Sequence, residues 1–385
     1  MYCVLLTAYA LMAADRFLFP VLAPNVRQDF TFSLAATGLL STIFTLGLGV
    51  GGLPTGYLLS RFSRKAVLMT GIAIFSGATA LTTVATGFWT LLICLAVTGI
   101  GMAMMATVMF ALAASYFYRS RGAAIGSVNV CYGIGAIVGP ILAGAFLTAS
   151  GSWRAPMVAF GAFGFVMIGV IAVSVRRYFT EARLDAQGRT DERGAPTLLN
   201  RNTVLLTVLS GIFGLILYGF LGMYPTFLRE SLLYEATAAG FVMGFFGLGA
   251  LASIGGGWLG DRFSPRSVLS GAFGSAALLG YFLFHGSATL WVQAALTCAY
   301  GVVGSAVLYV NLAGYHVKAL LPSLAGRGSG MFVTSFYASS AVAGYLMGWL
   351  AGQSGWVRAG ELQISLLSVV AAVLALALRP KDMSL

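Results

Sequence analysis

The chain is built from long apolar runs that are separated by short clusters of charged and turn-forming residues. Twelve runs can be read, with boundaries good to about 2–4 residues, at 2–24, 33–60, 66–85, 89–117, 122–149, 153–175, 203–228, 236–260, 267–285, 288–317, 328–352 and 362–378. Most of them reach the length of about 20 residues that a helix needs to cross a bilayer. The sequence therefore predicts an all-α membrane protein with twelve transmembrane helices.

The composition excludes a water-soluble protein. Charged residues make up 9% of the 385 residues and hydrophobic residues 59%, whereas a soluble domain carries about 25% charged residues. The apolar runs leave only short loops, and no nucleotide-binding, zinc or nucleophile-elbow motif is present. We therefore expect neither an enzyme nor a site for a cofactor or a metal ion.

The basic residues predict the orientation of the chain in the membrane. If both termini are cytoplasmic, the inner loops hold 17 of the 22 lysines and arginines, and the outer loops hold 4. This asymmetry follows the positive-inside rule. We expect a multi-pass protein of the plasma membrane (a bacterial inner membrane) with both termini in the cytoplasm. The same distribution explains the net charge of +11 without a nucleic-acid partner.

A polar stretch in the middle of the chain predicts two halves. Residues 176–202 hold six arginines and four acidic residues, a composition that suits a flexible linker. The prediction is a six-helix bundle at 1–175, a cytoplasmic linker at 176–202 and a second six-helix bundle at 203–385. The segments 56–68 and 257–269 share glycine, Arg-Phe-Ser and Val-Leu in register at an offset of 201 residues. This repeat implies two parallel halves related by a pseudo-twofold axis along the membrane normal.

Two motifs carry a resemblance to a known family. The Gly-x-x-x-Asp-Arg-x-x-x-Arg pattern after the second and eighth runs resembles the signature of the major facilitator superfamily, and Gly135-x-x-x-Gly139-Pro140-x-x-x-Gly144 is similar to another of its motifs. The resemblance covers the whole chain. It implies two bundles around a central cavity, transport by alternating access and a conformational latch. The latch residues would be Gly56, Ser60, Arg61, Arg64, Gly257, Asp261, Arg262 and Arg266, together with Arg121.

The first copy of the loop motif departs from the family pattern. Ser60 stands where the motif has an aspartate, and only the second copy keeps it, as Asp261. We expect Asp261 to meet the start of the fifth run near Arg121, where the helix dipole and free N–H groups stabilise a carboxylate by up to about 1–2 kcal/mol. Serine brings no charge, so the latch on the Ser60 side is predicted to be weaker. Leu95 also replaces an arginine that many family members carry in the fourth run.

Asp15 and Arg16 are the only acid and the only base deep inside a predicted span. A charged side chain at mid-membrane costs at least about 2.5–3.5 kcal/mol, so such residues need a reason. They could form a structural ion pair, although neighbours on a helix point about 100° apart. Alternatively, Asp15 takes up and releases a proton, and Arg16 binds an anion with its planar guanidinium.

The sequence around this pair adds a second resemblance. Residues 13–24 resemble the first-span motif of organic-anion:proton symporters and are similar to that of spinster-type lipid transporters. In the symporters the aspartate is the protonation site and the arginine contacts the anion. Further polar residues that could complete a substrate site are Tyr9, Asn129, Tyr132, Tyr218, Tyr300, Asn311 and Tyr337. Interfacial or packing roles for the tyrosines, and helix–helix hydrogen bonds for the asparagines, are the alternatives.

These observations lead to a functional hypothesis with two alternatives. The leading one is a monomeric, proton-coupled symporter of a small organic anion, monocarboxylate-like, in a lipid bilayer. The second is a proton-driven exporter of hydrophobic or amphiphilic compounds, which a methionine face at Met102, Met105 and Met109 favours and Leu95 disfavours. The third is a membrane sensor that binds a ligand without transporting it.

Overall fold

The structure is a computed structural model that describes residues 1–116, 121–176, 180, 195–321 and 324–383. Within these ranges, the side chains of residues 53, 60, 114–116, 121–125, 325–326 and 382 are not described. Each predicted run coincides with one helix or with consecutive helices. Ten described helical stretches are long and apolar enough to cross a membrane, or eleven with one bent pair counted. Apart from an isolated bridge between Ala195 and Leu320, the described residues form no β-structure.

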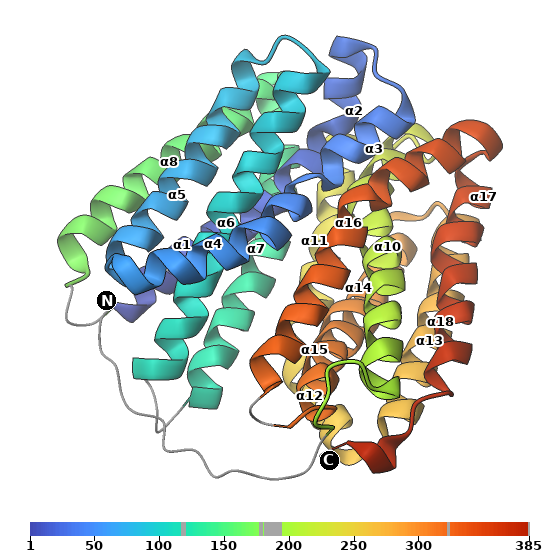
Figure 1. The fold of residues 1–385 in the computed structure, drawn as a ribbon. Coiled ribbons are helices and arrows are strands. Elements are labelled where there is room, and N and C mark those ends of the chain that lie inside the picture. Colours follow the sequence, from blue (N-terminus) through green and yellow to red (C-terminus); the bar gives the residue numbers. More distant parts are fainter. Residues whose placement is uncertain (117–120, 177–179, 181–194, 322–323, 384–385) are drawn as a thin grey trace.

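The helices form two groups that face each other (Figure 1). The first group consists of α1 (Tyr2–Arg16), α2 (Leu18–Phe30), α3 (Leu34–Thr42), α4 (Phe44–Arg61), α5 (Arg64–Leu81), α6 (Phe88–Tyr116), α7 (Arg121–Ser150) and α8 (Arg154–Ser174). The second consists of α10 (Arg201–Glu230), α11 (Ala236–Ala250), α12 (Ser253–Arg262), α13 (Pro265–His285), α14 (Leu290–Gly301), α15 (Val310–Lys318), α16 (Ala325–Ser354), α17 (Trp356–Gly360) and α18 (Leu367–Ala375). Two π-helical segments, Val302–Tyr309 and Glu361–Leu366, continue α14 and α17.

The first membrane-crossing stretch is broken in its middle. Pro20 has no N–H to donate to the carbonyl group of Arg16, four residues earlier, which favours a break at this point. Accordingly, α1 ends at Arg16 and α2 begins at Leu18. Asp15 and Arg16 therefore lie at an interruption of the helix, deep inside the stretch from Tyr2 to Phe30.

The repeated loop serves the same local purpose in both groups. The hydroxyl oxygens of Ser63 and Ser264 each accept a hydrogen bond at 3.2 Å from the backbone N–H three residues later. These bonds cap the N-termini of α5 and α13. The basic residues that follow hold the ends of other helices: Lys65 donates to the carbonyl oxygen of Val175 at 2.6 Å, and Arg266 donates to that of Leu378 at 2.8 Å.

Glycines at equivalent positions bring equivalent helices together. A Cβ atom on Gly99 would lie 1.8 Å from the carbonyl oxygen of Phe44, and one on Gly301 would lie 2.3 Å from that of Phe246. No larger residue fits there, so α6 packs directly on α4, and α14 packs directly on α11. This close approach also fixes Phe44 and Phe246, whose rings lie beside the space between the two groups.

The two groups meet most closely in the half of the molecule away from the termini, here called the far side. On that side, a Cβ atom on Gly344 would lie 2.1 Å from the carbonyl oxygen of Gly38, and one on Gly240 would lie 2.2 Å from that of Pro140. Nearer the termini, a Cβ atom on Gly126 of α7 would meet no atom within 4 Å. The two groups therefore touch on the far side and separate toward the side that carries the termini (Figure 1).

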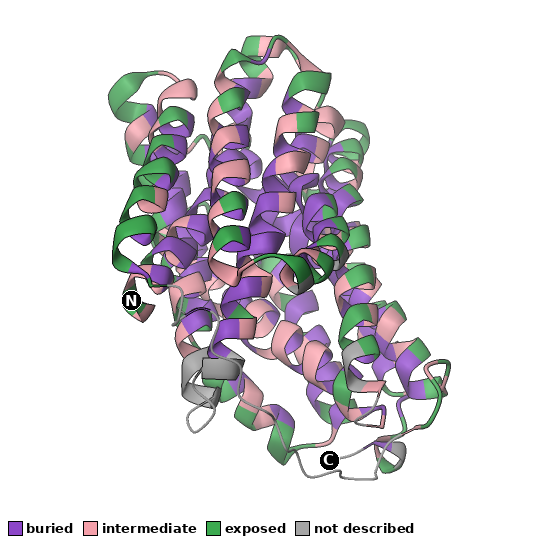
Figure 2. Ribbon diagram, turned by 60° about the vertical axis from the view of Figure 1, so that its left-hand side comes forward, coloured by how far each residue is buried: buried purple, intermediate pink, exposed green. Residues whose placement is uncertain are grey.

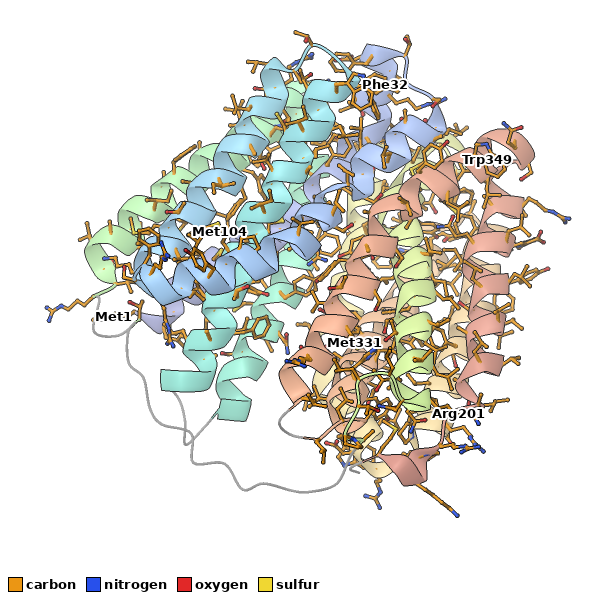
Figure 3. All side chains as sticks on the ribbon, viewed as in Figure 1. Met1, Phe32, Met104, Arg201, Met331 and Trp349 are labelled. Atoms are coloured by element: carbon orange, nitrogen blue, oxygen red, sulfur yellow. The ribbon has the colours of Figure 1, made fainter. Side chains whose placement is uncertain are left out.

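Burial follows this architecture (Figure 2). Buried residues fill the spaces between helices, whereas large apolar side chains such as Val173 and Leu278 are exposed on the outer faces, as expected for helices that face lipid. Met102, Met105 and Met109 are at most 1% exposed. Neighbouring Met104 is also surrounded by helices of the first group (Figure 3). The methionine face is thus a packing element of the first bundle.

Candidate functional site

A cavity of about 320 Å³ lies between the two groups of helices. Its wall is mostly apolar and aromatic. The lining residues are Tyr9, Met12, Arg16, Leu48, Ala106, Phe110, Asn129 and Tyr132 from the first group, and Leu217, Tyr218, Leu221, Phe246, Ser253, Ser305, Tyr309, Val310, Ala313, Phe336 and Tyr337 from the second. Both groups contribute polar atoms, so a ligand held here would contact both bundles.

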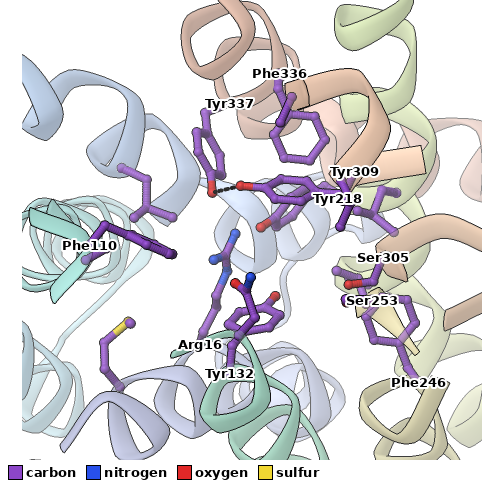
Figure 4. Close-up of a pocket in the computed structure, with 18 of the residues that line it drawn as sticks. Arg16, Phe110, Tyr132, Tyr218, Phe246, Ser253, Ser305, Tyr309, Phe336 and Tyr337 are labelled. Atoms are coloured by element: carbon purple, nitrogen blue, oxygen red, sulfur yellow. Dashed lines mark hydrogen bonds between the residues drawn. The ribbon is translucent and has the colours of Figure 1, made fainter. Parts of the chain in front are cut away.

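The side chain of Arg16 lies among the aromatic residues that line this cavity (Figure 4). It is the only charged residue in the described lining. Its guanidinium carbon lies 5.4–5.7 Å from the ring centroids of Phe44, Tyr132, Tyr218 and Tyr337, within the range of cation–π attraction. These rings attract the guanidinium cation but carry no negative charge that would neutralise it.

The guanidinium group of Arg16 retains unused hydrogen-bonding capacity. Its Nε atom is buried and has no hydrogen-bond partner among the described residues, and none of the described acidic side chains forms an ion pair with it. A buried donor left unpaired is costly, by about 1–3 kcal/mol and more when charged. The arrangement is therefore suited to an anionic ligand that would supply both the charge and the acceptor.

Asp15 points away from the cavity, into the first bundle. Its carboxylate oxygen Oδ2 accepts a hydrogen bond from the hydroxyl group of Thr79 on α5 at 3.0 Å. The residue is 7% exposed and does not line the cavity. Asp15 and Arg16 thus form no ion pair with each other. Both lie in the last turn of α1, where neighbouring side chains point about 100° apart, so the base faces the cavity and the acid faces the inside of the bundle.

The structure brings six of the eight predicted substrate-site residues to the cavity: Tyr9, Arg16, Asn129, Tyr132, Tyr218 and Tyr337. It places the other two inside the second bundle. The ring of Tyr300 packs on Phe220 with 4.5 Å between centroids. The amide nitrogen of Asn311 donates to the carbonyl oxygens of Gly256 and Val307, each at 2.9 Å. Asn311 therefore makes the helix–helix hydrogen bond that was the alternative interpretation.

Several cavity residues were not predicted from the sequence, among them Phe246, Ser253, Ser305, Tyr309 and Phe336. The hydroxyl groups of Tyr309 and Tyr337 lie 3.5 Å apart (Figure 4). Ser305 and Tyr309 both belong to the π-helical segment of the tenth span, a feature that is frequent at functional sites. No spacing signal for a π-helix was available in the sequence, and the phenylalanines resemble any other core residue.

Comparison with known proteins shows the family. Residues 5–345 match the family model described as Major Facilitator Superfamily. The chain belongs to the major facilitator superfamily. It is similar to the 4-hydroxybenzoate transporter PcaK of Pseudomonas putida, with 24% identity over 80% of this chain and 73% of the relative. It is also similar to the gallate transporter of Pseudomonas putida, with 25% identity over 67% of this chain and 64% of the relative.

A solved structure has the same fold. The bacterial homolog of the human lysosomal transporter Spinster superposes with a TM-score of 0.76 at 16% identity, covering 97% of this chain and 93% of that one. The predicted all-α membrane fold with two six-helix bundles is confirmed. The chain is an integral membrane protein and a transporter, not an enzyme.

Three of the predicted latch residues of this transporter, Arg61, Asp261 and Arg262, make described contacts inside their own bundles. Asp261 forms an ion pair with Lys318 of α15 at 2.7 Å, and Arg266 donates to the carbonyl oxygen of Leu378, just after α18. The guanidinium carbon of Arg61 lies 4.6 Å from the ring centroid of Tyr57, and that of Arg262 lies 5.3 Å from the ring centroid of Trp258.

The other predicted latch residues lie near the same side of the molecule. Arg64 donates to the carbonyl oxygen of Thr180 at 3.3 Å. A Cβ atom on Gly56 would meet no atom within 4 Å, and one on Gly257 would meet only the Val310 side chain, at 3.8 Å. The side chains of Ser60 and Arg121 lie outside the described residues. A latch between the bundles on this side stays a prediction for another conformation.

Polar contacts join the two groups on the far side, where the sequence predicted none. Arg27 of α2 forms an ion pair with Glu230 of α10 at 2.5 Å, and Arg229 donates a hydrogen bond to Asn25. Residues 28–29 near the end of α2 correspond to residues 229–230 at the end of α10 in the 201-residue repeat. The contacts therefore join equivalent helix ends across the pseudo-twofold axis and favour a closed far side.

Replacing Glu230 by glutamine should weaken this closure. The pair is partly exposed, with 32% and 23% of the two side chains accessible, so we expect a loss of at most about 1 kcal/mol, or about a fivefold shift in population. Spin labels at Trp89→Cys and Ala288→Cys, on opposite groups, should show a larger fraction of long distances. The ion pair of Arg154 with Asp29 lies within the first group, so Arg154→Gln is the control and should leave the distances unchanged. Equal distance distributions in Glu230→Gln and the unmodified protein would contradict the closing role.

Proposed function

We propose that this transporter carries small organic monocarboxylates with an apolar, aromatic body, in symport with protons. The observation that carries the proposal is Arg16: one partly buried cation inside a ring of aromatic side chains, whose buried Nε donor has no partner in the described structure. A carboxylate matches the planar guanidinium through paired hydrogen bonds. A second carboxylate would find no further charged residue in the described lining, which favours a monoanion.

The wall of the cavity supports an aromatic body for the substrate. Aromatic rings pack favourably edge-to-face or offset, and the rings of Phe246, Phe336 and Phe110 line the space beyond Arg16. The volume of about 320 Å³ lies in the usual range for small-molecule sites. The relatives named for 4-hydroxybenzoate and gallate transport agree with this substrate class.

Asp15 is proposed as the proton-coupling residue. An ionised carboxylate inside a bundle is strongly disfavoured unless a charge or several donors compensate it. Thr79 is the one hydrogen-bond donor that the described structure gives Asp15. A protonated Asp15 fits this environment, and ionisation requires that the bundle opens or that the neighbouring guanidinium turns toward it. Anion binding at Arg16, one residue along the chain, would then be coupled to the protonation of Asp15.

Transport in proteoliposomes tests both parts of the proposal. In vesicles containing the purified protein, an inward gradient of benzoate should acidify the lumen faster than in empty vesicles. Asp15→Asn keeps an acceptor for Thr79 but cannot ionise, so it should abolish the proton flux while exchange of labelled for unlabelled benzoate persists. Thr79→Val is the control, and should reduce proton flux without abolishing it.

Two results would contradict the proposal. Undiminished acidification in Asp15→Asn would remove Asp15 from the coupling mechanism. The absence of uptake and exchange for every aromatic and aliphatic monocarboxylate, with the protein folded, would remove the proposed substrate class.

A further inference from the structure

The central cavity continues into a side pocket between the two bundles. This pocket has a volume of about 170 Å³ and is lined by residues of α7, α12 and the end of α11, with one residue of α15. Asn129, Ser253 and Val310 line both spaces, so the side pocket opens from the central cavity. Figure 4 shows Ser253 close to Phe246 and Ser305, on a part of the wall away from Arg16.

The side pocket has a polar mouth and an apolar interior. At the mouth, the Ser253 hydroxyl donates to the carbonyl oxygen of Ala250 and keeps lone pairs that can accept. The Asn129 side chain is exposed to the space and has no hydrogen bond to a described residue. Beyond the mouth, the described lining consists of Gly126, Val130, Ala250, Leu251 and Ile254. No charged side chain belongs to it.

The sequence creates this space in two ways. The eighth span is bent by 41° between α11 and α12, at Leu251 and Ala252, which turns α12 away from the line of α11. On the opposite wall, Gly126 leaves out a side chain, and a Cβ atom there would meet no atom within 4 Å. On the far side of the same helix pair, Gly240 and Pro140 are in direct contact. The pocket is therefore local to the part of α7 and α12 that faces the cavity.

We infer that the side pocket is a second substrate subsite, which takes an extension on the end of the substrate that is remote from its carboxylate. The extension would carry a hydrogen-bonding atom, such as an ether or hydroxyl oxygen, at the level of Asn129 and Ser253. A short apolar chain would follow it into the pocket. This inference rests on the proposed function, because Arg16 fixes which end of the substrate faces the pocket. It extends the substrate class to para-substituted aromatic acids that are longer than simple benzoates.

A homologous series of ligands tests the inference on the purified full-length transporter. Binding of benzoate, 4-methoxybenzoate, 4-propoxybenzoate and 4-butoxybenzoate is measured by calorimetry. Burying one methylene is worth about 0.8 kcal/mol, so each added methylene should tighten binding about fourfold until the pocket is full. Gly126→Leu fills the pocket, and should remove this gain while benzoate binding changes less than about twofold.

The matched control is Gly169→Leu. Gly169 is an exposed glycine of α8 where an added Cβ atom would also meet no atom within 4 Å, and it lines neither space. This variant should show the same gain per methylene as the unmodified protein. If Gly126→Leu does not fold, Val130→Phe blocks the pocket from the next helical turn, since Val130 is 38% exposed and has room for a larger side chain.

The outcomes separate this inference from the proposed function. A gain per methylene that persists in the blocked variants comes from ligand partitioning elsewhere, and overturns the subsite. Equal affinities for the whole series in the unmodified protein overturn it as well. Failure of benzoate itself to bind contradicts the proposed function instead, and leaves no basis for a second subsite.

Discussion

Replacing Arg16 by alanine is expected to abolish the binding of every carboxylate substrate. The substitution removes the one cation of the described cavity lining, and nothing else near the four surrounding rings can compensate an anion. Truncating one partner of a buried, hydrogen-bonded charge pair costs about 2–5 kcal/mol, which is a loss of about 30-fold or more in affinity. Calorimetry with benzoate, together with the ligand-induced shift in melting temperature, measures the loss.

Arg16→Lys separates the role of charge from that of shape. Lysine keeps the positive charge but lacks the planar fork that pairs with both carboxylate oxygens. We expect an affinity between those of Arg16→Ala and the unmodified protein. The Arg16→Ala protein should remain folded, because removing the arginine side chain also removes a buried Nε donor that has no hydrogen-bond partner in the described structure. Benzoate binding that survives in a folded Arg16→Ala protein would show that the anion binds elsewhere.

The sequence predicted the fold well because each span carries its own signal. An apolar run between charged clusters defines a span regardless of its neighbours, and all twelve predicted runs became helices. The repeat is also local: the serine of Arg-Phe-Ser caps the following helix in both copies, as Ser63 and Ser264. The boundaries of the two bundles and the linker remain predictions, since residues 181–194 lie outside the described part of the chain.

The site was predicted less completely, because which side chains point into the cavity depends on how each helix is rotated and tilted in the bundle. Tyr218 and Tyr300 look alike in sequence, yet Tyr218 lines the cavity and Tyr300 packs inside the second bundle. The opposite directions of Asp15 and Arg16 follow from helix geometry, but which of them faces the cavity does not. Arg16 could be singled out because a deep charge is costly, whereas Tyr309 and Ser305 carry no such signal.

Latch contacts are harder still to predict, because they belong to one conformation at a time. The repeated motif predicts a contact of Asp261 on the side of the termini, where the two groups are separated in this structure. The far-side ion pair of Arg27 with Glu230 belongs to no sequence motif, so the sequence did not predict it. An alternating-access protein needs contacts on both sides whose strengths nearly balance, since a few kcal/mol separate the states.

The second large effect is expected at Gly344, where α16 touches α3. Substituting leucine there would place the Cβ atom 2.1 Å from the carbonyl oxygen and 2.7 Å from the carbonyl carbon of Gly38. These two nearest neighbours are backbone atoms, which cannot rotate away. Overpacking of this kind costs about 1–3 kcal/mol or more, and the cost falls only on conformations closed on the far side. Gly344→Leu should therefore favour the far-side-open state, reduce transport in proteoliposomes by at least tenfold and lengthen the distance between labels at Trp89→Cys and Ala288→Cys.

A glycine of the same helix provides the control for this prediction. Gly352 lies about two turns beyond Gly344 in α16, and a Cβ atom there would meet no atom within 4 Å, so Gly352→Leu should transport at the normal rate. Benzoate binding should persist in Gly344→Leu, because neither Gly344 nor Gly38 lines the cavity. Lost transport with retained binding would identify the change as a block of far-side closure, whereas normal transport with unchanged label distances would show that the Gly38–Gly344 contact does not control the cycle. Loss of both binding and transport would instead indicate a folding defect, and Gly344→Ala, with a smaller overlap, then decides whether far-side contact governs transport.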